Sequence, residues 1–334
     1  MTTHRLDVVG IGNAIVDILG RCDDAFLAKH GAPKGHMRLV DPATLMALYM
    51  NMGPGIEISG GSAANTIAGA ASLGGKTGFI GKVANDEFGR IFAHDIRAQG
   101  VSFASTAVDA AAGGSTSRSL ILVTPDGERT MNTYLGVSTQ FTPADLDADL
   151  IASAQIVYLE GYLFDGDDAK AAFRRAAQIA HAAGRKVALS LSDSFCVDRH
   201  RAELQEFVAG GVDILFANES EIISLYETAD FDAAARMAAC DVKLAALTRG
   251  AKGSVILADG AATAIEVTAV ATVVDTTGAG DLYAGGVLFG IARGASLETA
   301  GLLGSLAAAE IISHIGARPQ VNLAKLAEES GIKI

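Results

Sequence analysis

The chain has 334 residues, of which 50% are hydrophobic and 19% are charged, and its formal net charge is −12. This composition predicts a folded protein with a large core and argues against disorder. The acidic balance also argues against a nucleic-acid partner or an anionic membrane surface. The isolated residues Cys22, Cys196 and Cys240 predict neither a disulfide framework nor a structural zinc site.

The N-terminal twenty residues contain only short apolar runs. Asp7, Asn13 and Asp17 interrupt them. This pattern predicts neither a signal peptide nor a membrane span, and we expect a cytoplasmic protein.

Strand-like apolar runs then alternate with alanine-rich helical segments. The predicted strands are 5–12, 77–84, 156–164, 186–192, 212–218 and 244–250. The predicted helices are 63–74, 86–100, 167–184 and 230–240. Such alternation is typical of a parallel sheet covered by helices on both faces, so the predicted fold class is α/β.

Two segments interrupt the alternation, residues 14–58 and 113–136. Within the second, residues 115–135 have the pattern of a β-hairpin that turns at Pro125-Asp126-Gly127. We interpret both segments as a small β-rich lid. The α/β core would then consist of residues 1–13, 59–112 and 137–334.

Two glycine-rich stretches only superficially resemble nucleotide-binding loops. In GAASLGGKT (69–77), Ala70 holds the first glycine position of a P-loop, and the stretch joins a helix to a strand rather than a strand to a helix. GIGNAI (10–15) lacks the third glycine of a dinucleotide fingerprint. Neither stretch therefore predicts a phosphate site.

A third stretch, VVDTTGAGDLYAGG (273–286), carries an acid beside two glycines. Val273 and Val274 are interpreted as a strand end, and a helix follows the turn. Gly278 and Gly280 would let an anion approach backbone N–H groups at a helix N-terminus. Asp281 would be placed to accept a proton, although an aspartate at a helix start is common for structural reasons alone.

The stretch GGSAANTIAGAASLGG (60–75) adds a second glycine pair, followed by Asn65. Together with GKVANDEFG (81–89) and DTTGAGDLYAGG (275–286), it resembles the phosphofructokinase B or ribokinase-like carbohydrate kinases. The segment GNAIVDILG (12–20) is similar to the adenosine kinase branch of that family. The resemblance covers nearly the whole chain and implies a three-layer α/β/α core with a mostly parallel sheet and a small β lid.

The resemblance also implies roles for individual residues. Asp281 would be the catalytic base, and the backbone of Gly278, Ala279 and Gly280 would form an anion hole for the transferred phosphoryl group. The residues expected to bind the acceptor, or in the case of the arginine to close over the phosphates, are Asn13, Asp17, Gly60, Gly61, Asn65 and Arg118.

The implied cofactors are ATP and Mg²⁺, with K⁺ in some family members. Glu221 would hold Mg²⁺ through water. Residues expected to contact the nucleotide are Asn218, Thr248, Arg249, Gly250, Gly253, Ala308 and Ile312. Those near an expected monovalent cation are Asp275, Thr277 and Gly316.

Three functions remain open from the sequence. The first is an ATP-dependent nucleoside kinase, most simply one that converts adenosine to AMP. The second is a kinase of the same family that acts on ribose, fructose or a keto-deoxy sugar acid. The third is a sensor of nucleosides or sugars without catalysis. The expected partners are a small-molecule acceptor and ATP, and both a monomer and a homodimer are compatible with the sequence.

Overall fold

The computed structural model describes residues 6–103, 105, 107–109 and 114–333. Residues 1–5 of the predicted core, residues 104, 106 and 110–112 of its second segment, and residue 113 at the start of the second predicted lid segment lie outside the described residues, as does the C-terminal residue 334. In the described ranges, no helix is both long and apolar enough to cross a bilayer.

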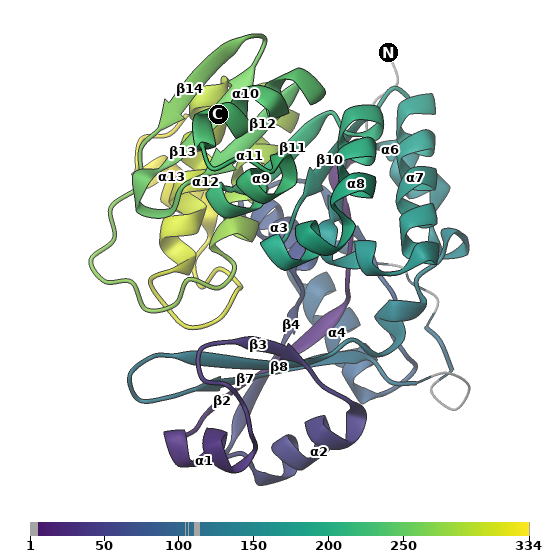
Figure 1. Cartoon of the computed structure of the whole chain (residues 1–334), viewed down its shortest axis with the longest axis vertical. Coiled ribbons are helices and arrows are strands. Elements are labelled where there is room, and N and C mark those ends of the chain that lie inside the picture. Colours follow the sequence, from purple (N-terminus) through teal and green to yellow (C-terminus); the bar gives the residue numbers. More distant parts are fainter. Residues whose placement is uncertain (1–5, 104, 106, 110–113, 334) are drawn as a thin grey trace.

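Most described strands lie side by side in one sheet at the centre of the larger part of the molecule (Figure 1). In spatial order these strands are β14 (Ala261–Ile265), β13 (Ser254–Ala258), β12 (Leu244–Thr248), β11 (Ile214–Asn218), β10 (Lys186–Ser190), β9 (Ala154–Glu160), β1 (Leu6–Ile11), β5 (Thr77–Ile80) and β6 (Ser102–Phe103). Within the described part of this sheet, the antiparallel pairs are β12–β13 and β13–β14, and the other neighbouring strands pair in parallel. The predicted parallel sheet is thus confirmed.

Helices cover both faces of this sheet, because its central strands bury apolar side chains on both sides. Val157 and Leu159 of β9 face one core cluster, whereas Ile156 and Tyr158 face the other. The first face carries α6 (Ala148–Ser153), α7 (Asp167–Ala182), α8 (Ser194–Gly211), α9 (Glu219–Tyr226) and α10 (Phe231–Asp241). The second carries α3 (Ser62–Ser72), α4 (Glu87–Ala98), α11 (Ala279–Ala292) and α12 (Leu297–Ile311), with α13 (Leu323–Glu329) outside them.

Short 3₁₀ helices complete the core. They are η1 (Gly136–Gln140), η2 (Pro143–Asp145), η3 (Gly161–Asp165) and η4 (Gly250–Lys252). In chain order, η1 and η2 lie between β8 and α6, η3 follows β9, and η4 lies in the turn between β12 and β13.

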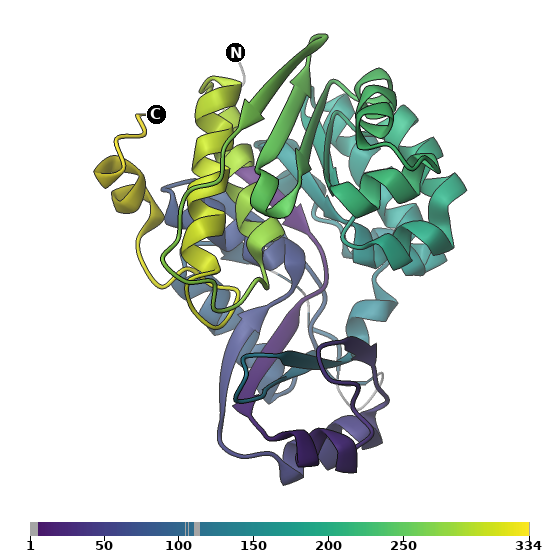
Figure 2. The same cartoon turned by 60° about the vertical axis from the view of Figure 1, so that its left-hand side comes forward.

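A second sheet lies at one end of the core (Figures 1 and 2). Its spatial order is β3 (Met37–Leu39), β8 (Arg129–Tyr134), β7 (Ser117–Val123), β2 (Ile15–Arg21) and β4 (Gly55–Gly60). Two helices, α1 (Asp24–Lys29) and α2 (Pro42–Asn51), pack on it. The predicted hairpin is confirmed, since β7 and β8 pair antiparallel from Arg118–Tyr134 to Val123–Arg129.

The strand end predicted at Val273 and Val274 does not form. Val273 and Val274 lie in an exposed loop that leads to α11, and their side chains are 55% and 42% exposed. The N–H groups of Val274 and Asp275 donate to the carbonyl of Ile312, at 2.7 and 3.3 Å. The prediction of a strand end was wrong because this backbone pairs with the C-terminus of a helix instead of a sheet edge.

Candidate active site

The carboxylate of Asp281 is held by two side chains from another helix. Asp281 lies in the first turn of α11, after Gly278, which adopts φ 78° at the N-cap. Ser62 Oγ donates to Oδ1 at 2.6 Å, and Asn65 Nδ2 donates to Oδ2 at 2.9 Å, both from α3. Burial raises the pKa of Asp281 above its ordinary value, although both donors oppose this shift. A raised pKa suits a group that accepts a proton near neutral pH.

The first turn of α11 offers backbone donors beside this carboxylate. The N–H of Ala279 already donates to the carbonyl of Thr276 at 3.2 Å. The amides of Gly280 and Asp281 come next and precede the first helical bond, from Leu282 N to the carbonyl of Gly278 at 2.8 Å, so they have no intrahelical partner. A side chain at Gly280 would meet open space. The predicted glycine turn therefore leaves room for an anion at the amide of Gly280.

Asp17 of β2 is buried and lies directly over Gly60. A Cβ atom on Gly60 would stand 2.1 Å from Asp17 Oδ2, so only glycine lets the carboxylate take this position. Burial raises the pKa of Asp17 to about 7, while Arg318 and Arg129 lower it. Asn65 Oδ1 is also buried and has no partner in the described chain. Both groups can therefore accept hydrogen bonds from hydroxyls of a bound molecule.

Glu160 bonds two of the segments by which the chain passes between core and lid. It lies at the end of β9 and is 1% exposed. Its carboxylate accepts from Asn13 Nδ2 at 2.6 Å, from Asn13 N at 3.2 Å and from Ala63 N at 2.8 Å. Asn13 precedes β2, and Ala63 follows β4, so one side chain fixes both crossings.

A buried arginine, Arg318, lies near the acids Asp17 and Asp281. It is 6% exposed, and its Nε and Nη2 donate to the carbonyl and hydroxyl of Ser59 at 2.8 and 3.0 Å. Burial lowers its pKa to about 10, and Asp95, Asp17 and Asp281 oppose that shift. Nη1 has no partner among the described residues. A buried N–H donor is thus available near Asp17 and Asp281.

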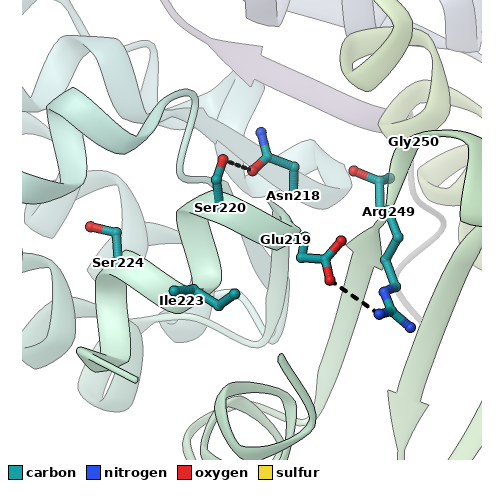
Figure 3. Close-up of a pocket in the computed structure, with 8 residues that line it drawn as sticks. Asn218, Glu219, Ser220, Ile223, Ser224, Arg249 and Gly250 are labelled. Atoms are coloured by element: carbon teal, nitrogen blue, oxygen red, sulfur yellow. Dashed lines mark hydrogen bonds and ion pairs between the residues drawn. The ribbon is translucent and has the colours of Figure 1, made fainter. Parts of the chain in front are cut away.

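An open pocket of about 570 Å³ lies between the ends of β11 and β12 (Figure 3). Arg249 lines it and bridges to Glu219, with Nη2 and Oε1 3.1 Å apart. Its volume is within the range of small-molecule sites. The structure thus brings together four of the predicted nucleotide residues, and the pocket lining is Asn218, Glu219, Ser220, Ile223, Ser224, Thr248, Arg249 and Gly250.

The other predicted nucleotide residues lie elsewhere. Gly253 adopts φ 82° before β13, where a Cβ atom would stand 2.2 Å from the carbonyl of Ile265. Ala308 lies on α12 and Ile312 caps its C-terminus. None of the three lines the pocket between β11 and β12.

Glu221, the predicted Mg²⁺ residue, is buried in the first turn of α9. Its Oε2 accepts from Asn218 N at 2.9 Å and its Oε1 from Asn218 Nδ2 at 2.6 Å, which completes a capping box. Burial raises its pKa to about 7. Each carboxylate oxygen keeps a further acceptor position, which fits contact to a water molecule of Mg²⁺ better than direct ligation. No group of three or more metal-binding side chains occurs in the described ranges.

Arg118 and the expected monovalent cation residues have definite places. Arg118 of β7 lies over the ring of Phe88 at 4.7 Å and donates to Ser115 Oγ at 3.0 Å. Asp275 accepts from Gly316 N at 3.0 Å and from Thr277 N at 2.9 Å, so these three residues do lie together.

The family model described as pfkB family carbohydrate kinase matches residues 57–323. The chain belongs to this family. It is therefore a kinase, a phosphotransferase with an alcohol group as acceptor, and kinases of this family use ATP, generally with Mg²⁺.

Several known proteins are similar to this pfkB kinase over most of its length. Adenosine kinase from Sinorhizobium meliloti is 52% identical, with a TM-score of 0.91 over 98% of this chain and 99% of that one. A probable sugar kinase from Rhizobium etli CFN 42 is 48% identical, with a TM-score of 0.92 over 99% and 100%. Fructokinase-1 from Oryza sativa subsp. japonica is 29% identical over 70% of this chain and 73% of its own.

Sequence reasoning missed several polar residues of this kinase's site. Ser62, Glu160 and Arg318 each contact a residue far away in the sequence, and nothing in their local sequence indicates that contact. The available signal was weak. Glu160 is an acid at the carboxyl end of a predicted strand, where ligand sites of parallel sheets lie.

Glu160 gives a prediction about pH. Because burial raises its pKa from 4.5 to about 7, the native kinase binds more protons than the unfolded chain between these values. The stability that the protonated side chain of Glu160 contributes to the native kinase is fully present below pH 4.5 and is lost as the pH rises through about 7. We expect Glu160→Gln to reduce the fall in unfolding free energy across this window, by up to about 3 kcal/mol. Urea unfolding of both proteins across that window measures it.

Glu206→Gln is a matched control for this experiment, because Glu206 is exposed on α8. We expect its pH dependence to equal that of the wild type. The same pH dependence in Glu160→Gln and wild type would contradict the assigned role of Glu160.

Proposed function

We propose that this pfkB kinase transfers the γ-phosphoryl group of ATP to the 5′-hydroxyl of adenosine, which yields AMP and ADP. The observation that carries the chemistry is the contact of Asp281 with Ser62 and Asn65, at 2.6 and 2.9 Å. The choice of adenosine is supported by the 52% identity with the adenosine kinase of Sinorhizobium meliloti over 98% of the chain.

In the proposed reaction, Asp17 and the free Oδ1 of Asn65 accept hydrogen bonds from ribose hydroxyls and so fix the acceptor. Asp281 takes the proton of the attacking hydroxyl, whose oxygen forms a bond to the γ-phosphorus while the bond to the bridging oxygen of ADP breaks. Backbone amides of the first turn of α11 donate to the phosphoryl oxygens as their charge redistributes.

The nucleotide would lie in the pocket lined by Asn218, Thr248 and Arg249, with its phosphates directed toward α11. Mg²⁺, held through water at Glu221, would supply positive charge to the phosphate oxygens. The acids of the site support this role. Burial raises the pKa of Asp17, Glu160 and Glu221, and the negative charge of Asp281 raises each of them further, so a bound cation would relieve repulsion among these acids.

The deciding experiment is ADP formation from ATP and Mg²⁺ with a panel of acceptors, namely adenosine, inosine, guanosine, ribose, fructose and 2-keto-3-deoxygluconate. We expect kcat/KM for adenosine to exceed that for ribose and fructose by about 100-fold or more, because unmet polar groups of a nucleoside site penalise a smaller acceptor. Turnover of a sugar alone would replace adenosine with that sugar. Tight binding without any turnover would indicate a sensor.

A sugar acceptor is the second candidate. The 48% identity with the probable sugar kinase of Rhizobium etli favours it, and the same Asp281 chemistry would apply. The acceptor panel separates the two candidates directly.

A further inference from the structure

The lid contributes a cation to the loop before α11. Arg129, the first residue of β8, donates through Nη1 to the carboxylate of Asp275 and to the hydroxyl of Thr277. Its side chain is 9% exposed, and that of Asp275 is 1% exposed. The positive group therefore lies where the sequence predicted a monovalent metal ion.

The hairpin between β7 and β8 brings the guanidinium to this place. In Figures 1 and 2 its tip reaches from the lid toward the loops that flank α11 and α12. Two hydrogen bonds within the turn hold the tip: Thr124 N donates to the carbonyl of Glu128 at 2.9 Å, and Thr124 Oγ1 to Asp126 at 2.6 Å. Arg129 directly follows this turn, so the turn fixes the position of its backbone relative to the loop before α11.

The residues around Asp275 do not suit an additional metal ion. Asp275 Oδ1 accepts from Thr277 N, and Oδ2 accepts from Gly316 N, besides the contact with Arg129. One buried carboxylate is already paired with one buried cation. A metal ion at these oxygens would lie beside the guanidinium of Arg129, and the two positive charges would repel each other in this buried place.

We propose that Arg129 is the resident cation of the loop before α11, and that this kinase uses no monovalent metal ion there. The charge arrives on the lid, so the loop receives it only while the β7–β8 hairpin lies against the core. Nε and Nη2 of Arg129 are buried and have no partner in the described chain, which leaves two donor nitrogens for oxygen atoms of bound substrates. The inference rests on the kinase activity of the family and not on the choice of acceptor.

The test compares KCl with choline chloride at equal ionic strength, for the wild type and Arg129→Ala. We expect the wild type to show the same Tm and the same rate of ADP formation in both salts. Arg129→Ala should lose about tenfold or more in kcat in choline and recover part of it in KCl. Its Tm without any substrate should rise by about 3 °C in KCl, because K⁺ can then fill the vacated position.

Two further variants serve as controls, one that keeps the positive charge and one that removes an arginine elsewhere in the lid. Arg129→Lys keeps the charge and should retain more activity in choline than Arg129→Ala. Arg38→Ala removes a lid arginine that donates to Asn132 and to the carbonyl of Gly31, away from the loop before α11. Its Tm and kcat should be the same in KCl and in choline chloride. Activation of the wild type by KCl over choline would overturn the proposal. So would an Arg129→Lys variant as impaired as Arg129→Ala, or an Arg129→Ala variant with wild-type turnover in choline.

Discussion

Replacement of Asp281 by asparagine is expected to reduce kcat by about 10³-fold, the largest effect that we predict for a single side chain. The amide has the size of the carboxylate but cannot take up the proton of the attacking hydroxyl. Ser62 and Asn65 still surround it, so the site should keep its shape. The measurement is steady-state ADP formation together with calorimetric titration of the acceptor.

The split between kcat and binding decides the role of Asp281. We expect the acceptor dissociation constant to change by less than about threefold, since the lost interaction acts in the transition state. Asp168→Asn, at an exposed position in the first turn of α7, serves as the control and should be fully active. Unchanged kcat in Asp281→Asn would remove Asp281 from the mechanism.

Replacement of Gly61 by alanine is expected to lower both stability and activity. Gly61 is the N-cap of α3 with φ 92°, and an added Cβ would stand 2.3 Å from the carbonyl oxygen of Asn13. The backbone strain alone costs about 1–3 kcal/mol. Relief of the clash would move Asn13 or the start of α3, which carries Ser62 and Asn65. Displacement of about 1 Å there should reduce kcat/KM by about 10²-fold.

Gly74→Ala is the control that separates the effect of backbone strain from the effect of moving Asn13 or the start of α3. Gly74 has a similar φ of 90°, but an added Cβ would meet no atom within 4 Å. We expect it to lose about 1–2 kcal/mol of unfolding free energy and to keep its kcat/KM. Urea unfolding and initial rates measure both quantities. Equal losses of activity in the two variants would show that displacement of Asn13 and α3 is not the cause.

The core could be predicted well where strands buried on both faces leave short, continuous apolar runs in the sequence. The strands β1, β9, β10, β11 and β12 are short apolar runs, and the helices between them are amphipathic or alanine-rich. Val273 and Val274 have the same local signal, yet both are exposed, and the N–H of Val274 donates to the carbonyl of Ile312 at the end of α12. Two adjacent valines could not indicate that no sheet edge is available to them.

The candidate site was predictable only as far as its motifs extend. Asp281, Asn65 and Asp17 could be named because glycine-rich stretches and a family resemblance mark them. Glu160 and Arg129 have no such mark, since their partners lie 97 or more residues away in the chain. Polar contacts over such separations are a property of the fold, and the local sequence around either partner does not indicate them.

The position of β1 in the sheet has a consequence for the order of folding. β1 lies between β5 and β9, and β2 lies between β4 and β7, so neither N-terminal strand can complete its pairing from nearby sequence. During synthesis, β1 must wait for residues 154–160 to leave the ribosome, and β2 must wait for residues 117–123. We therefore expect the nascent chain to expose apolar strands for a long interval. Non-local pairing of this kind slows folding and makes the growing chain dependent on protection from aggregation.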